Sequence, residues 1–236
     1  MTLDTPIAMI VVAAGSGQRF GGPLPKQYLD LAGQPVLFHT LKALHDFPEI
    51  KTILPVIAAD GYPLWNRWMA PRMATLPRVA SPVTGGATRQ ESVWKGLLAL
   101  NLPQDAWVGI HDAARPFPGK KLLERLMAGR STSTALIAAL PAADTVKRVD
   151  PQRGIILETL ERTQIWLAQT PQLFHYGQIL DLHNRARTSG FNGTDDASLA
   201  EWGGIAVKIV LGDSHNIKIT QPQDLEWART WLEEKQ

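Results

Sequence analysis

The order of apolar segments along the chain is the feature that most restricts its fold. Short apolar or β-branched runs alternate with longer segments whose apolar residues recur three and four positions apart. The short runs predict strands at 7–13, 51–58, 107–111, 135–140 and 205–210, and the longer segments predict helices at 36–47, 90–100 and 120–128. This alternation is typical of crossover units that feed a parallel sheet. We therefore expect an α/β fold with a mostly parallel, twisted sheet flanked by helices.

Two helix starts can be placed by their capping signals. Thr88 is followed three residues later by Glu91, and Thr220 by Gln223. In a capping box the first side chain accepts a hydrogen bond from a backbone amide, and the second side chain reaches back to the cap residue. Helices are therefore predicted to begin just after Thr88 and Thr220.

One segment interrupts the alternation with a hairpin signal. Two short extended runs, 145–149 and 155–160, are joined by Asp-Pro-Gln-Arg-Gly at 150–154. A two-stranded ribbon buries too little apolar surface to be stable alone, so this one needs a partner surface. A second copy of the chain is the simplest partner, which makes 144–161 a predicted dimerisation arm. The sequence has no internal repeat and no linker-like tract, so residues 1–236 are interpreted as one domain. The hairpin's need for a partner surface predicts a homodimer.

Composition excludes several functional classes. The chain has no cysteine, which removes disulfide frameworks, thiolate nucleophiles and Cys-ligated zinc. Its 24 basic and 22 acidic residues give a net charge of +2, too small for a nucleic-acid-binding surface. The N-terminus lacks a basic leader, and apolar runs stay short of a membrane span. We expect a cytoplasmic protein with small-molecule partners, no nucleic acid and no membrane.

A glycine loop follows the first strand in "IVVAAGSGQRFGGPLPKQY", residues 10–28. Glycines let backbone amides approach an anion closely, and phosphate is the usual one. The segment lacks the Gly-Lys-Ser/Thr ending of a P-loop, and Phe20 stands where a dinucleotide fingerprint needs Gly or Ala. A tight turn without a ligand is the alternative. Arg19 and Lys26 favour a site where charge develops on a phosphoryl group.

A second cluster, "IHDAARPF", lies at the predicted carboxyl end of a strand, where open α/β sheets bind ligands. Asp112 could hold a metal, orient a sugar hydroxyl or only pair with Arg115. His111 has no second histidine at metal-ligand spacing, so it is interpreted as a core residue. In the motifs that follow, Thr194 is most simply part of a helix cap and Lys218 a solvated cation.

Taken together, the motifs resemble those of the 2-C-methyl-D-erythritol 4-phosphate cytidylyltransferases. The matching segments, in family order and spacing, are AAGSGQRF, PKQ, GGATRQESV, HDAARP, TVKRV, LERTQIW, TPQLF, TDDAS and NIKIT. The resemblance extends from residue 7 nearly to the C-terminus and implies a Rossmann-like nucleotidyltransferase fold. It also implies attack of methylerythritol phosphate on the α-phosphate of CTP, which releases pyrophosphate in non-mevalonate isoprenoid synthesis.

The resemblance also implies roles for individual residues. Ala13, Ala14, Gly15, Ser16 and Gly17 match the loop around the triphosphate, with Arg19 and Lys26 as transition-state cations. Gly85, Gly86 and Ser92 match the cytosine-reading segment. Asp112 and Arg115 match the acidic and basic groups of the alcohol site, and Thr145, Arg162, Thr194 and Lys218 match groups that hold the substrate phosphate and polyol. Mg²⁺ or another divalent cation is expected, bound mainly through CTP phosphates rather than by a protein cage.

Three positions depart from the usual family pattern. Val12 stands where proline is usual and Phe20 where methionine is usual, and both read as packing changes. Ala87 stands where an acid is common beside the base-reading glycines, which puts one polar contact to the base in question, so Ala87 is not assigned to the site.

Two alternatives remain at this point. Ribitol 5-phosphate cytidylyltransferases share the fold and the CTP loop, but HDAARP favours methylerythritol phosphate as the alcohol. A catalytically silent nucleotide-binding module would have no need to keep Arg19, Lys26, Arg162 and Lys218 together.

Overall fold

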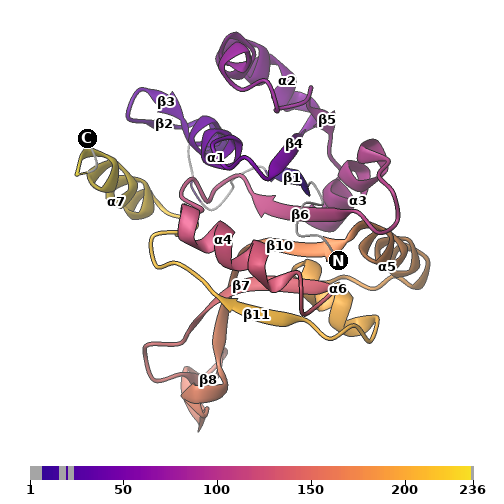
Figure 1. The fold of residues 1–236 in the computed structure, drawn as a ribbon. Coiled ribbons are helices and arrows are strands. Elements are labelled where there is room, and N and C mark those ends of the chain that lie inside the picture. Colours follow the sequence, from indigo (N-terminus) through magenta and orange to yellow (C-terminus); the bar gives the residue numbers. More distant parts are fainter. Residues whose placement is uncertain (1–6, 16–19, 21–23, 235–236) are drawn as a thin grey trace.

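The fold is taken from a computed structural model, which describes residues 7–15, 20 and 24–234. Within these residues, seven strands form one sheet in the order β11-β7-β10-β6-β1-β4-β5 (Figure 1). Its strands are β1 (Ile7–Ala13), β4 (Ile50–Ile57), β5 (Val83–Thr84), β6 (Trp107–Asp112), β7 (Ala135–Pro141), β10 (Trp166–His175) and β11 (Lys208–Leu211). Every pairing is parallel except those of β10, which runs antiparallel to β6 and β7. The mostly parallel sheet predicted from sequence is confirmed.

Helices cover both faces of this sheet (Figure 1). The main helices are α1 (Val36–His45), α3 (Arg89–Leu100), α4 (Lys120–Gly129), α5 (Tyr176–Ser189), α6 (Asp196–Trp202) and α7 (Pro222–Glu233). Shorter helical segments are η2 (Lys26–Tyr28), η3 (Ala59–Gly61), α2 (Tyr62–Leu64), η4 (Trp65–Met69), η5 (Ala70–Thr75) and η6 (Arg162–Gln164), and β2 (Asp30–Leu31) pairs with β3 (Gln34–Pro35). Among the described residues, no helix has the length and apolar character needed to cross a bilayer.

The core is divided by the sheet because side chains of a strand alternate between its faces. Along β1, Met9 and Val11 face a cluster that includes Leu41 of α1 and Leu126 of α4. Ile10 faces a second cluster with apolar residues of α3, α5 and α6. A third, smaller cluster joins α7 to β2 and the start of α1. This packing holds the carboxyl ends of β1, β4 and β6 at one edge of the sheet.

The predicted hairpin is present as β8 (Lys147–Asp150) and β9 (Ile155–Thr159), which pair only with each other and project from the body of the fold (Figure 1). Exposed ion pairing between Arg148 and Glu158 links the two strands. Ile155, Ile156 and Leu157 are each more than half exposed in the single chain. The apolar surface that called for a partner is therefore uncovered here.

Three sequence predictions were wrong in detail. β10 was missed, because its sequence begins beside the hairpin and contains Pro171, and it lies in the middle of the sheet. The strand predicted at 205–210 begins only at Lys208. The last helix is capped by Gln221 with Asp224 rather than by Thr220 with Gln223.

Of the two hydrogen bonds of the capping box predicted at Thr88, one is present. Its hydroxyl accepts a hydrogen bond from the Glu91 amide, as expected for an N-cap. The Glu91 carboxylate, however, accepts from the amide of Ala87, one residue before the cap. Helix α3 therefore begins at Arg89, directly after the extended N-cap residue Thr88.

Candidate active site

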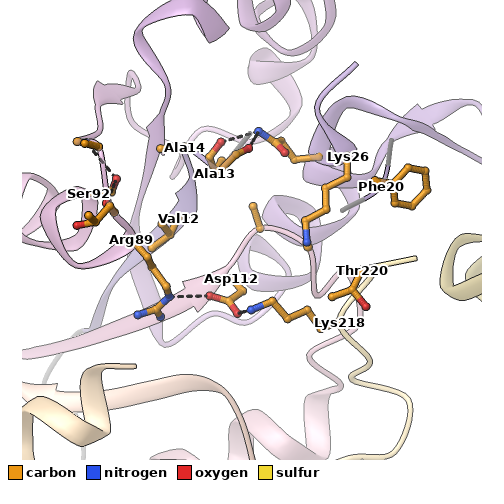
Figure 2. A pocket seen from close by; sticks show the side chains of 17 residues that line it. Val12, Ala13, Ala14, Phe20, Lys26, Arg89, Ser92, Asp112, Lys218 and Thr220 are labelled. Carbon is orange, nitrogen blue, oxygen red and sulfur yellow. Dashed lines mark hydrogen bonds and ion pairs between the residues drawn. The ribbon is translucent and has the colours of Figure 1, made fainter. Parts of the chain in front are cut away.

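A cavity of about 440 Å³ opens where the carboxyl ends of β1 and β6 meet the loops that follow them (Figure 2). Its described lining residues are Val12, Ala13, Ala14, Gly15, Phe20, Lys26, Gln27, Gly86, Ala87, Thr88, Arg89, Ser92, Asp112, Ala113, Ala114, Lys218 and Thr220. This is the edge at which open α/β sheets bind ligands. Eight of the site residues predicted from sequence line this one cavity: Ala13, Ala14, Gly15, Lys26, Gly86, Ser92, Asp112 and Lys218.

The start of the glycine loop is fixed by a buried glutamine. The Gln27 side chain is 4% exposed, and its Nε2 donates to the carbonyls of Ala13 at 2.7 Å and Gly15 at 3.2 Å. Because these two carbonyls are bonded to Gln27, the backbone at the carboxyl end of β1 is held in one orientation beside the cavity. Ser16, Gly17 and Arg19 lie outside the described residues.

Lys26 reaches the cavity from the short helix after the glycine loop (Figure 2). Its Nζ donates to the carbonyl of Ile219 at 2.9 Å, which ties the segment after the loop to the chain just before α7. The ammonium group is thus placed at the cavity by a contact between residues 193 positions apart. A cation held in this way can stabilise negative charge without reorganising first.

The opposite wall is formed by the turn between β5 and α3. The Ser92 hydroxyl is buried, accepts a hydrogen bond from the Gly86 amide and donates to the Thr88 carbonyl. A Cβ atom at Gly85 would lie 2.6 Å from the Ala14 Cβ and 2.8 Å from the Ser92 Oγ. Gly85 is therefore required for the close packing of this turn against the end of β1, although it does not itself line the cavity.

Asp112 is the last residue of β6 and forms ion pairs with two basic side chains. Its Oδ1 lies 3.2 Å from Nε of Arg89, and its Oδ2 lies 2.6 Å from Nζ of Lys218 (Figure 2). Burial raises the pKa of the Asp112 carboxyl, but the charges of Arg89 and Lys218 lower it by more, so this pKa lies well below its usual range. The carboxylate is therefore ionised and fixed in direction.

The backbone of Asp112 is supported from β10. The Thr170 hydroxyl accepts a hydrogen bond from the Asp112 amide and also contacts Nδ1 of His111. His111 is completely buried and its Nε2 contacts the Arg115 carbonyl. Burial lowers the pKa of His111 to about 4, so the ring is neutral at pH 7. The interpretation of His111 as a hydrogen-bonded core residue is confirmed.

The other predicted substrate residues lie outside this cavity in the single chain. Arg115 is partly buried and donates to the carbonyls of Asn216 and Ala168, so Asp112 forms its ion pairs with Arg89 and Lys218 instead. Thr145 and Arg162 are exposed at the base of the hairpin, where Arg162 donates to the Ala143 carbonyl. Thr194 is exposed just before α6.

The three departures from the family pattern have simple structural settings. Val12 and Phe20 both line the cavity and pack against the second and third apolar clusters, respectively. Ala87 lines the cavity while its amide donates to Glu91. The first two are thus packing positions, as expected.

Sequence reasoning missed Arg89 and Gln27 as members of the site. Both lie inside segments that were singled out, GGATRQESV and PKQ, but their roles depend on partners far along the chain. Arg89 contacts Asp112 and Asp196, which lie 23 and 107 positions away. For Arg89 the available signal was its place in the first turn of a predicted helix, where the helix dipole disfavours a basic residue and a role in the site is therefore indicated.

Two solved structures that resemble this chain carry names of the same enzyme activity. A 4-diphosphocytidyl-2C-methyl-D-erythritol synthase from Anaerococcus prevotii superposes with a TM-score of 0.83 at 31% identity, covering 98% of this chain and 99% of that one. A 2-C-methyl-D-erythritol 4-phosphate cytidylyltransferase from Francisella tularensis gives 0.81 at 34% identity, covering 96% and 99%. The fold is that of an α/β nucleotidyltransferase.

Sequence comparison narrows this class to one family. The profile of the 2-C-methyl-D-erythritol 4-phosphate cytidylyltransferases matches residues 7–234. A cytidylyltransferase of that name from Syntrophus aciditrophicus is 43% identical over 98% of this chain and 97% of its own length. The chain belongs to the 2-C-methyl-D-erythritol 4-phosphate cytidylyltransferase family.

Proposed function

We propose that the protein transfers the cytidylyl group of CTP to 2-C-methyl-D-erythritol 4-phosphate in non-mevalonate isoprenoid synthesis. An oxygen of the substrate's 4-phosphate attacks the α-phosphorus, the bond from that phosphorus to the oxygen that bridges it to the β-phosphate breaks, and pyrophosphate leaves with the electron pair. The bond formed is a phosphoanhydride between the 4-phosphate and the cytidylyl group, and the product is 4-diphosphocytidyl-2-C-methyl-D-erythritol. The observation that carries the proposal is one cavity lined both by the loop after β1 with Lys26 and by the ionised Asp112 with Lys218.

Lys26 stabilises the charge that builds up on the α-phosphate, and Arg19 is proposed as its partner. A cation already in place gains more from the concentrated charge of the transition state than from the dispersed ground state. The contact of Lys26 with the Ile219 carbonyl keeps its ammonium group at the cavity. The backbone around Ala13, Ala14 and Gly15, with Ser16 and Gly17, surrounds the triphosphate.

The turn of Gly85, Gly86 and Ser92 reads the base. Cytosine presents an amino donor where uracil has a carbonyl, so a wall of acceptors leaves groups unpaired with the wrong base. Close packing between Gly85, Ala14 and Ser92 gives this wall little freedom to adapt. CTP is therefore the proposed nucleotide, in preference to UTP.

Asp112 and Lys218 hold the alcohol substrate, with Arg115, Thr145, Arg162 and Thr194 completing its site. A phosphomonoester dianion calls for cations, and Arg162 and Lys218 supply them. Since Arg162 and Thr145 are exposed at the base of the hairpin, we propose that they act in the cavity of a second subunit. The exposed apolar side chains of β9 supply the surface on which such a homodimer forms.

Mg²⁺ fits this site only as a phosphate-bound ion. The described residues contain no group of three potential His, Cys, Asp or Glu ligands. Asp112, the one acid among the described lining residues, already has both carboxylate oxygens paired with cations. When bound, Mg²⁺ would lower the negative charge of the triphosphate, so that the anionic 4-phosphate of the substrate can approach. The protein is further proposed to act as a single cytidylyltransferase domain, in the cytoplasm.

A pyrophosphate-release assay tests these assignments. The protein is supplied with CTP or UTP, with 2-C-methyl-D-erythritol 4-phosphate or ribitol 5-phosphate, and with or without excess chelator. Turnover is expected with CTP and methylerythritol phosphate, and chelation should abolish it. Faster turnover of ribitol 5-phosphate, equal use of UTP, or activity in chelator would contradict the corresponding part of the proposal. Absence of turnover with every pair would favour a silent nucleotide-binding module.

A further inference from the structure

A partly buried arginine links Asp112 to a second acid that lies outside the cavity. Arg89 bonds through Nε to Oδ1 of Asp112 at 3.2 Å and through NH1 to Oδ2 of Asp196 at 2.8 Å (Figure 2 shows the first of these contacts). We propose that Asp196 is a positioning residue: it fixes the Arg89 guanidinium, which in turn fixes the Asp112 carboxylate for the alcohol. This inference rests on the proposed role of Asp112.

Asp196 is buried and is held by contacts from neighbouring elements. It is completely buried in the first turn of α6, and His183 of α5, also completely buried, places Nε2 3.3 Å from its Oδ1. Gln172 of β10 donates to the Asp195 carboxylate and accepts from the Ala197 amide, so it holds the residues on both sides of Asp196 in place. The acid is thus anchored to two further elements of the fold.

Charge keeps this linkage in one arrangement. Burial lowers the pKa of Arg89, but Asp196 and Asp112 raise it by more, so the guanidinium remains charged. Burial raises the pKa of Asp196, yet the charge of Arg89 and the contact with His183 bring it below its usual value. A guanidinium has rigid, planar donors, so anchoring NH1 to Asp196 also sets the direction of Nε toward Asp112.

The opposite side of Asp112 explains why this direction matters. Lys218 takes Oδ2 at 2.6 Å, so Arg89 and Lys218 together leave the carboxylate one orientation. Without the contact to Asp196, the Arg89 side chain could move together with Asp112 or lose its contact with it, and the Asp112 carboxylate could turn toward Lys218. Neutralising Asp196 is therefore expected to impair use of the alcohol while leaving CTP binding nearly unchanged.

The central experiment combines Asp196→Asn with Asp112→Asn. For Asp196→Asn, kcat/KM for methylerythritol phosphate is expected to fall about 10- to 100-fold, as for other residues that orient a functional side chain. The Kd for CTP from calorimetry should change by less than about threefold. In the Asp112→Asn background, adding Asp196→Asn should lower kcat/KM no further, because Asp196 acts through Asp112.

Tyr176→Phe is the matched control for a purely structural effect. The Tyr176 hydroxyl is buried and donates to the Leu97 carbonyl, away from the cavity. Its loss should lower the thermal unfolding midpoint by roughly 2–4 °C and leave kcat/KM unchanged. If Asp196→Asn affects only the unfolding midpoint, as Tyr176→Phe does, the positioning role is overturned.

Arg89→Lys covers the case in which Asp196→Asn does not fold. Lysine keeps the buried charge but cannot span both carboxylates. The same loss of kcat/KM is expected, again with no further loss in the Asp112→Asn background. An Arg89→Lys effect that adds in full to that of Asp112→Asn would contradict the inference. If Asp112→Asn alone keeps wild-type kcat/KM, the proposed role of Asp112 fails instead, which is a separate outcome.

Discussion

The Lys218 ammonium lies 2.6 Å from the Asp112 carboxylate, although 106 residues separate them in the chain. Asp112 ends a central strand, whereas Lys218 lies in the segment between β11 and α7. Together with the contact from Arg89, this pairing lowers the pKa of Asp112, keeps it ionised and fixes its direction in the lining of the cavity. The chemistry of the site therefore depends on how the C-terminal segment returns to the edge of the sheet.

Replacement of Lys26 tests the cation at the transition state. Lys26→Ala should lower kcat by about 10²- to 10³-fold, equivalent to roughly 2.7–4 kcal/mol, because the lost interaction is strongest in the transition state. Lys42→Ala is a suitable control, since Lys42 pairs with Asp46 on the exposed face of α1. Steady-state kinetics that show a raised KM for CTP at normal kcat would refute the assigned role.

Gly85→Ala tests the close packing beneath the base-reading turn. The added methyl group would overlap the Ala14 Cβ and the Ser92 side chain, so the turn must shift, at a cost of about 1–3 kcal/mol. We expect a lower unfolding midpoint and roughly tenfold weaker CTP binding in calorimetry. Gly61→Ala is the matched control, because its Cβ would make only ordinary contacts of 3.5 Å or longer. Equal CTP affinity in the two variants would disprove this account.

Mixed dimers test whether the hairpin shares its residues between subunits. Lys26→Ala and Arg162→Ala are each expected to be inactive. When they are unfolded and refolded together in equal amounts, about half of the dimers are mixed, and one site of each mixed dimer carries neither defect. Activity should return to about a quarter of wild type. A mixture as inactive as its parents, with mixed dimers verified by mass, would show that Arg162 acts in its own subunit.

His111 predicts how stability depends on pH. Its pKa is about 4 in the folded protein against about 6.5 when unfolded, so the unfolded state binds more protons between these values. The free energy of unfolding should therefore fall as pH falls from 6.5 to 4, by about 3 kcal/mol from this residue. Urea titrations of wild type and His111→Gln at pH 7.0, 5.5 and 4.5 measure the free energy of unfolding, and the difference between the two proteins gives the contribution of His111. Parallel curves for the two proteins would rule out this contribution.

Much of the fold follows from local sequence. The strand at Ile7–Ala13, the starts of α1 and α4 and the hairpin are found where periodicity and turn residues predict them. These elements are specified by short-range signals: apolar spacing and turn residues. β10 escaped prediction because its position depends on pairing with β6 and β7, which no local pattern encodes.

By itself, the sequence determined the chemical character of the site: a glycine loop with nearby cations, a carboxylate at a strand end and the motifs of one enzyme family. The tertiary structure alone decided which charges meet. Asp112 pairs with Arg89 and Lys218 rather than with nearby Arg115, and Arg89 in turn is anchored by Asp196. The physical reason is that ion pairing depends on distance and burial in space, and both are set by the packing of α3, β6 and α6 rather than by separation along the chain.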